Sequence, residues 1–231
     1  MPKGIGWIMI RNTDISKISD GRFYKPTDMV KIGCNDCDGC SDCCHDMEAL
    51  MLDPMDIYRL QTGLGLSFEE MLDQAIELTR ADGLILPKMK MTNSKNDSPA
   101  CSFLNEEGRC SIHSFRPGIC RLFPMGRYYE DHDYKYFLQV NECSRKKRYK
   151  IRLNQWLDTE DLDSYHDYIV DWHYFAKELG QKTPLLTEES RKEVLMYVIR
   201  LFFQTPYQAD DFYPQFYLRF AQAKRVFSSL F

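Results

Sequence analysis

The chain has 231 residues, of which 44% are hydrophobic and 13% aromatic, enough for one domain or two closely packed ones with a substantial core. Its formal net charge is −4, which argues against a nucleic-acid partner because proteins that bind nucleic-acid grooves are usually basic. No stretch of 18 apolar residues occurs, so we expect no membrane-spanning segment and no membrane partner. The apolar run at 5–10 is short for a signal peptide, so we expect a cytoplasmic location and reduced thiols.

The first third of the chain carries few periodic signals. We expect residues 1–33 to be irregular apart from one short strand at 7–10. Asp53 followed by Pro54 is typical of a helix N-terminus, and the glycines at 63 and 65 predict the end of that helix.

The next stretch combines one helix signal with one loop signal. Ser67 and Glu70 form a capping-box pattern, which predicts a helix over 68–81 that ends at Gly83. Residues 91–99 are polar and are expected to form a loop.

Two hairpins and a sharp turn are predicted in the middle of the chain. Residues 101–113 place apolar positions on both sides of Asn-Glu-Glu-Gly, and residues 128–140 do the same around 130–133. The segment 116–121 contains Pro117 and Gly118 and is expected to turn between these hairpins.

The last third changes to helical periodicity, with helices expected at 159–179 (ending at Gly180), 188–204 and 211–229. The predicted fold is therefore mainly α with small antiparallel β-hairpins, an α+β fold. We expect an irregular cysteine-rich metal-binding region over 1–150, with a helical region over 151–231 packed on it.

Cysteine is the residue type that most clearly indicates function. Five cysteines fall within eleven residues, and four more follow along the chain. Pairs separated by two residues can direct both sulfurs at one ion, so repeated C-x2-C spacing predicts a metal centre. The predicted ligands are Cys34, Cys37, Cys40, Cys43, Cys44, Cys101, Cys110, Cys120 and Cys143.

Disulfides are a weaker explanation of these cysteines. Nine is an odd number, and the adjacent pair Cys43 and Cys44 is poorly placed to bridge to itself.

The spacing of Cys34, Cys37, Cys40 and Cys44 matches the C-x2-C-x2-C-x3-C run of bacterial ferredoxins. Thiolates suit both zinc and iron–sulfur clusters, so the residues leave the metal open, as well as the choice between two sites and one large centre. A structural zinc site can contribute about 10–16 kcal/mol to the free energy of folding. We therefore expect the region 34–143 to loosen without its metal.

Arginine and histidine side chains near the cysteines have two interpretations each. Arg116 and Arg121 could offset the negative charge of a thiolate-rich cofactor, or could form ordinary surface ion pairs. His45 and His113 could be ligands or ordinary polar residues. His166 and His173 lie two helical turns apart on one predicted helix, so we do not expect them to share a metal ion.

Several catalytic motifs are missing. The C-x3-C-x2-C run of radical S-adenosylmethionine enzymes fails, because Cys40 and Cys44 would require a third cysteine where Met47 stands. Gly63-Leu-Gly65 follows a predicted helix rather than a strand, so it does not predict a dinucleotide site, and neither a P-loop nor H-E-x-x-H occurs.

The motifs together resemble a known family. Cys37-x2-Cys40-x2-Cys43-Cys44 is followed by Cys101-Ser-Phe-Leu, Gly108-Arg-Cys110-Ser-Ile112 and Arg116-Pro117-x2-Cys120-Arg121-x-Phe-Pro124. This order and spacing resemble the CxxCxxCC (YkgJ-like) zinc- or iron-chelating proteins over about 34–145. The resemblance extends distantly to the flagellin lysine methylases, which carry a similar cluster and use S-adenosylmethionine.

The resemblance and the residues leave three hypotheses for function. The first is a cytoplasmic protein that holds zinc or an iron–sulfur cluster. The second is an enzyme whose centre performs redox or methyl-transfer chemistry on a peptide or protein partner. The third is a zinc-stabilised module that recruits a protein through its C-terminal helices.

Overall fold

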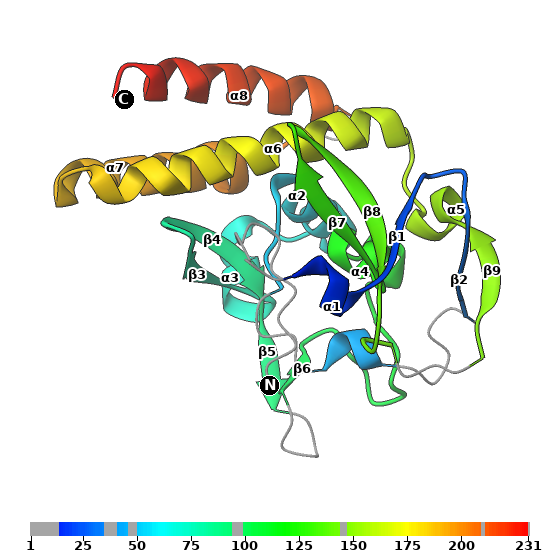
Figure 1. Ribbon diagram of the computed structural model, residues 1–231. Coiled ribbons are helices and arrows are strands. Elements are labelled where there is room, and N and C mark those ends of the chain that lie inside the picture. Colours follow the sequence, from blue (N-terminus) through cyan, green and yellow to red (C-terminus); the bar gives the residue numbers. More distant parts are fainter. Residues whose placement is uncertain are drawn as a thin grey trace.

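The structure is a computed structural model that describes residues 14–34, 41–45, 50–93, 99–143, 147–208 and 211–230. It confirms an α+β fold, with small antiparallel sheets of two or three strands to one side of the long C-terminal helices (Figure 1). The strands are β1 (Ser19–Tyr24), β2 (Met29–Gly33), β3 (Ile76–Ala81), β4 (Leu84–Met89), β5 (Met91–Asn93), β6 (Pro99–Cys101), β7 (Met125–Glu130), β8 (Asp133–Gln139) and β9 (Tyr149–Arg152).

The helices include three long C-terminal ones that lie together at one side of the molecule (Figure 1). Three 3₁₀ turns, at Asp42–Cys44, His113–Phe115 and Thr183–Leu185, and a π-helical turn at Arg200–Gln204 complete the helical structure. The α-helices are α1 (Ile15–Ile18), α2 (Pro54–Leu64), α3 (Phe68–Gln74), α4 (Gly118–Leu122), α5 (Leu153–Leu157), α6 (Leu162–Lys182), α7 (Glu188–Ile199) and α8 (Phe212–Ser228).

The expectation that residues 1–33 are irregular is wrong for the part that the structure describes. Strand β1 adds to the β7–β8 hairpin in a sheet of order β1-β8-β7, and β2 pairs with β9. Both pairings join segments more than 100 residues apart, so local periodicity carried no sign of them. The expected strand at 7–10 lies outside the described residues.

The helix predicted over 68–81 is half as long as expected. Helix α3 ends at Gln74, and Ile76–Ala81 instead forms β3, which pairs with β4 in continuous register from Ile76–Met89 to Ala81–Leu84. Asp82 and Gly83 connect the strands with φ of 47° and 83°. An Asp-Gly pair at positive φ is a strong hairpin signal. Gly83 therefore turns a hairpin rather than ending a helix.

Two other local predictions need adjustment. The expected loop at 91–99 contains β5 at one end and the start of β6 at the other, with the residues between them outside the described part. The expected hairpin at 101–113 has no continuous strands, but an isolated antiparallel bridge between Leu104 and Cys110 joins its arms. The N–H of Ser111 also donates to the carbonyl of Phe103, and the N–H of Asn105 to the carbonyl of Arg109, each at 2.9 Å. The hairpin at 128–140 is confirmed as β7–β8, with Asp131 and His132 at positive φ in its turn.

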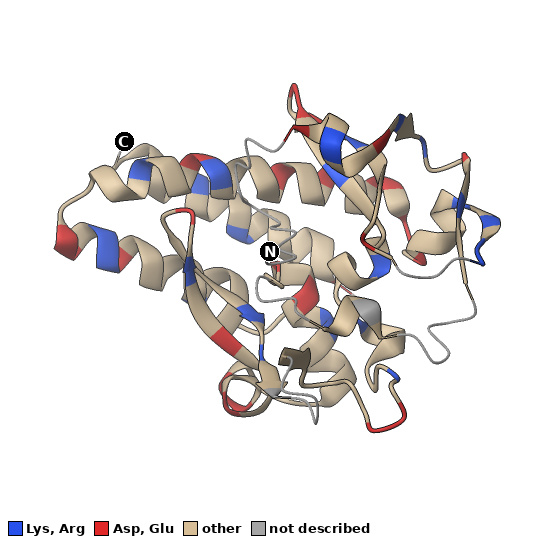
Figure 2. Cartoon of the chain, turned by 60° about the horizontal axis from the view of Figure 1, so that its bottom comes forward, with Lys and Arg blue, Asp and Glu red and all other residues tan. Residues whose placement is uncertain are grey.

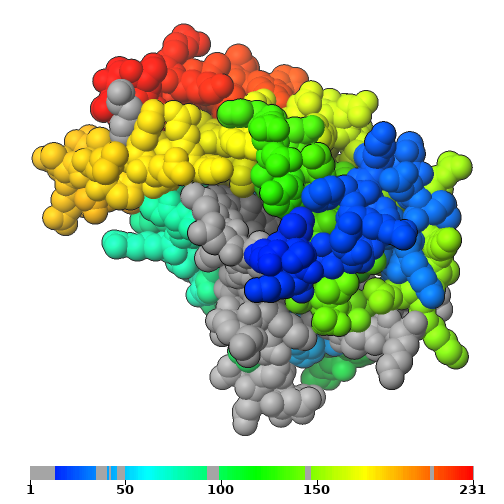
Figure 3. All heavy atoms as spheres, viewed as in Figure 1, coloured from blue at the N-terminus to red at the C-terminus, as the bar shows by residue number. Residues whose placement is uncertain are grey.

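The three C-terminal helices are confirmed and pack around an aromatic core. Trp172 of α6 has its ring centroid 5.1 Å from that of Phe202 and 6.4 Å from that of Phe216 of α8. The β7–β8 hairpin lies against α6, as Figure 3 shows in green and yellow, and the Tyr129 ring stacks on His173 at 3.6 Å. One hydrophobic cluster includes buried residues from both 1–150 and 151–231. The boundary at 150 itself stays a prediction.

Gly180 does not end α6 as expected, since the helix continues to Lys182. A Cβ on Gly180 would lie 2.1 Å from the carbonyl oxygen of Asp82, and one on Gly83 would lie 2.2 Å from the carbonyl oxygen of Gly180. The two glycines therefore allow the β3–β4 turn to touch the backbone of α6.

Among the described helices, none combines the length and the apolar composition needed to cross a bilayer.

Candidate metal centre

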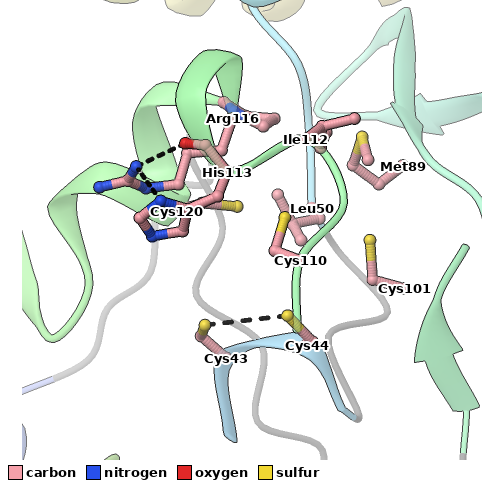
Figure 4. A pocket seen from close by; sticks show the side chains of 11 residues that line it. Cys43, Cys44, Leu50, Met89, Cys101, Cys110, Ile112, His113, Arg116 and Cys120 are labelled. Carbon is pink, nitrogen blue, oxygen red and sulfur yellow. Dashed lines mark hydrogen bonds between the residues drawn. The ribbon is translucent and has the colours of Figure 1, made fainter. Parts of the chain in front are cut away.

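Five of the nine cysteines come from four separate segments to line one cavity. Cys43 and Cys44 lie in the 3₁₀ turn at 42–44, and Cys101 ends β6. Cys110 follows the turn at 105–108, and Cys120 lies in α4. Figure 4 shows Cys43 and Cys44 on one side of the cavity and the other three cysteines across from them.

Short backbone contacts bring these segments together. His45 forms an isolated bridge with Ala100, which places the adjacent cysteine pair beside the end of β6. The N–H of Leu104 donates to the carbonyl of Cys101 at 2.9 Å, and Leu104 bridges to Cys110. Ligand segments far apart in the sequence are thus held in register by ordinary main-chain hydrogen bonding.

The spacing of the adjacent sulfurs fits binding to one ion. The Sγ atoms of Cys43 and Cys44 lie 4.0 Å apart. Two thiolates on one tetrahedral zinc, with Zn–S near 2.3 Å, would lie about 3.8 Å apart. Although adjacent side chains need not share an ion, this pair faces a single cavity and lies within chelating distance.

The cavity has a volume of about 30 Å³ and walls of mixed character. Leu50, Met89 and Ile112 are buried and supply apolar surface. Burial raises the pKa of the Cys101 thiol to about 11. Burial also raises the pKa of the Cys120 thiol, and the nearby Cys43, Cys101 and Cys110 raise it further. Their mutual repulsion as thiolates is what a bound cation would relieve, and metal binding would release the protons.

His113 and Arg116 also line the cavity. The Arg116 Nη1 donates to the carbonyl of His113 at 2.6 Å and lies 3.2 Å from its Nδ1 (Figure 4). These bonds hold the Arg116 side chain against His113 at the wall of the cavity. The expected role of its charge beside a thiolate-rich centre stays a prediction.

Arg121 is buried and faces away from this cavity. Its guanidinium donates to the carbonyl oxygens of Ser114 (2.5 Å), Arg116 (3.2 Å) and Asp158 (2.6 Å), and to Oδ2 of Asp158 (2.9 Å). These bonds close the turn that carries Cys120. Arg121 is therefore a clamp on the backbone behind the site, rather than one of the side chains that line it.

Asp56 supports the same turn from the other side, and it was missed in the sequence. Its Oδ1 accepts a 2.7 Å hydrogen bond from the N–H of Gly118, and its backbone and side chain form a capping box with Asp53. Burial is the larger cause and the neighbouring Asp53 the second, and together they raise the pKa of Asp56 to about 8. The repeated acid at the N-cap and third helical positions was the available signal.

The remaining predicted ligands are not brought to this cavity in the described structure. Cys34 follows β2, where its carbonyl accepts from the hydroxyl of Tyr149, and Cys143 follows β8. Neither cysteine lines the cavity. His45 does not line it either, and its Nε2 lies 3.1 Å from the hydroxyl of Ser41. Cys37 and Cys40 lie outside the described residues. The described cysteines are free of disulfides.

Within the described ranges, no three His, Cys, Asp or Glu side chains lie close enough to hold an ion by themselves. The donor set is nevertheless the soft thiolate type that zinc and iron–sulfur clusters take. Leu50, Met89 and Ile112 could not be predicted as its walls, because apolar residues occur throughout the chain.

Comparison with known proteins identifies the region that carries the site. Residues 36–144 match the model of the CxxCxxCC family, described as "Putative zinc- or iron-chelating domain". No curated protein and no solved structure matches the chain. The expected distant relationship to the flagellin lysine methylases stays a prediction. The matched range contains all five cysteines of the cavity, so the site lies within the domain at residues 36–144 that matches the CxxCxxCC family.

Proposed function

We propose that this domain holds zinc or an iron–sulfur cluster through cysteine thiolates at the cavity described above. The supporting observation is that five thiols from four segments line one small space. Cys37 and Cys40, which precede the 3₁₀ turn by a few residues, complete the ligand set in this proposal. The bound group would cross-link the 3₁₀ turn, β6, the 105–110 turn and α4.

Cys34 and Cys143 have a separate place in the proposal. Cys34 follows β2 and Cys143 follows β8, and neither lines the five-cysteine cavity. If Cys37 and Cys40 join the five cysteines of the cavity, these two are left over, and a second site would need further ligands. The choice between one large centre and two sites stays a prediction. Metal stoichiometry distinguishes one site from two.

The proposal also includes a reducing compartment such as the cytoplasm and no nucleic-acid partner. Thiolate ligands require reduced cysteines, which a reducing compartment maintains. Basic and acidic residues are mixed along the helices in Figure 2, and the formal net charge is −4. Long-range attraction of a polyanion would need a basic face instead. A peptide or protein partner stays a prediction.

Anaerobic purification tests the proposal. We expect stoichiometric zinc or iron by elemental analysis, with a broad absorption near 400 nm if the centre is iron–sulfur and a colourless protein if it is zinc. Cys120→Ser should lower the metal content, whereas Ser111→Ala, at an exposed position beside Cys110, should not. A wild-type chain that folds fully and carries neither metal would disprove the proposal.

Removal of the metal supplies a second test. Because the bound group would join four segments, hydrogen exchange after chelation should rise in β6 and α4 but not in α6 and α8. Equal protection in the metal-free and metal-bound chains would show that the region does not depend on metal.

A further inference from the structure

A second pocket, of about 470 Å³, shares a wall with the cysteine cavity. The segment 113–121 separates them: His113 and Cys120 line the cysteine cavity, whereas Ser114 and Arg121 line the second pocket. Asn154 and Gln155 of α5 form part of the opposite wall. The volume falls within the range of small-molecule sites.

Arg59 of α2 reaches this pocket with unused hydrogen-bonding capacity. Its Nη1 is buried and has no hydrogen-bond partner in the described structure, and its guanidinium carbon lies 5.6 Å from the centroid of the Tyr165 ring. A buried charged donor without an acceptor is costly, because water has been removed and nothing replaces it. Arg121 differs, since its donors bond to carbonyl oxygens and to Asp158.

The acidic groups near Arg59 leave room for an added negative charge. Asp158 already pairs with Arg121 at 2.9 Å. Asp53 and Asp56 are buried and do not line the pocket. Burial raises the pKa of both, which reduces the negative charge that they offer to Arg59. Glu160 also lines the pocket and is exposed. Its negative charge would repel a second anionic group on the ligand.

The amides of α5 supply further donors. The side-chain oxygen of Asn154 accepts from the N–H of Gln155 at 2.8 Å, which leaves the Asn154 NH₂ group available. Gln155 is exposed and lines the same pocket. A guanidinium fork beside amide donors is the arrangement that recognises carboxylate and phosphate oxygens.

We propose that this pocket binds a small molecule through one oxyanionic group, a carboxylate or a phosphate, held by the guanidinium of Arg59. The proposal goes beyond the metal centre and does not depend on which metal is bound. Two sources share this chemistry, a monocarboxylate and a phosphate monoester, and the test separates them.

Thermal unfolding of the full chain, with the metal content it has on purification, provides the test. Sodium phosphate and sodium acetate are titrated separately, against sodium chloride at matched ionic strength. We expect a saturable rise in melting temperature with at least one probe. Saturation by phosphate alone supports a phosphate group, and saturation by acetate alone supports a carboxylate.

Variants locate the binding. Arg59→Gln should weaken the apparent affinity at least about tenfold, as loss of a charged hydrogen bond predicts. Arg80→Gln, an exposed arginine of β3 that does not line the pocket, should leave it within about twofold. If Arg59→Gln fails to fold, Gln155→Glu adds a negative charge at an exposed position and should weaken binding similarly.

Equal metal content in all variants, measured alongside, separates this result from any effect at the cysteines. No saturable response above chloride with either probe would overturn the proposal. So would unchanged affinity in every folded variant among Arg59→Gln and Gln155→Glu.

Discussion

The backbone N–H of Gly118 donates a 2.7 Å hydrogen bond to Oδ1 of Asp56, and this contact joins α2 to the turn that carries Cys120. The two residues are 62 positions apart, and Asp56 is fully buried. The position of Cys120 thus depends on a carboxylate that lies outside the cysteine motifs.

Asp56→Ala should therefore destabilise the protein. The substitution leaves the buried N–H groups of Gly118 and Asp53 without an acceptor. The free energy of unfolding should fall by about 1–3 kcal/mol for each of these groups that water does not reach. Urea unfolding followed by circular dichroism measures it. Asp73→Ala, at an exposed position of α3, is the matched control and should change little. Equal unfolding midpoints for the two variants would contradict the assigned role.

The stability of the chain should also depend on pH through Asp56. Burial raises its pKa to about 8 in the folded protein, against about 4 in the unfolded chain. The folded state then binds more protons than the unfolded state between these values, so this group's contribution to stability is present at low pH and is lost as pH rises toward 8. Asp53 shifts in the same direction.

Urea unfolding of wild type and Asp56→Asn between pH 5 and 8 measures this dependence. The difference between them isolates Asp56 from the thiols, which are common to both. The wild type should lose up to about 1.4 kcal/mol more per pH unit than the variant. Parallel pH profiles, or a steeper fall in Asp56→Asn, would argue against a protonated Asp56.

Arg121 should matter more than its ion pair. Arg121→Gln removes bonds to three carbonyl oxygens in a buried position and should cost about 2–4 kcal/mol. Asp158→Asn removes only the carboxylate of the pair, whose side chain is 65% exposed, and should cost less than about 1 kcal/mol. The comparison uses unfolding midpoints at one pH. Similar losses in both variants would show that the ion pair, rather than the carbonyl clamp, stabilises the turn.

Gly180→Ala should destabilise the protein although alanine favours helices. The new Cβ would lie 2.1 Å from the carbonyl oxygen of Asp82, so either α6 or the β3–β4 turn must move, at about 1–3 kcal/mol. Gln181→Ala, at the next and exposed position, is the control. A gain in melting temperature for Gly180→Ala, as at an open helical site, would mean that the two backbones do not touch.

Parts of the fold that depend on local chemistry could be predicted from the sequence. The N-cap at Asp53, the capping box at Ser67, the 128–140 hairpin and the three C-terminal helices all follow from short-range patterns. The error at 76–81 arises because Gly83 taken alone predicts the end of a helix, whereas Asp82 and Gly83 together are typical of a hairpin turn. Its apolar positions could fit either a helix or a strand, and the pairing partner β4 decided between them.

The candidate site was predictable in composition and much less so in arrangement. Spacing identified the cysteines, but Cys34, which follows β2, and Cys143, which follows β8, do not line the cavity. The sequence singled out Arg121 as a charge beside the cofactor but not as a clamp on carbonyl oxygens, and Arg59 gave no signal, because both roles depend on segments that are distant in the sequence. Such non-local contacts are fixed only when the chain folds.

X-ray absorption at the metal edge of anaerobically purified protein tests the central claim most directly, because it identifies the atoms bound to the metal. The account predicts an inner shell of sulfur alone near 2.3 Å, with metal content reduced in Cys110→Ser and Cys120→Ser. An inner shell made of nitrogen and oxygen, or full metal retention when both of these cysteines are replaced, would contradict it.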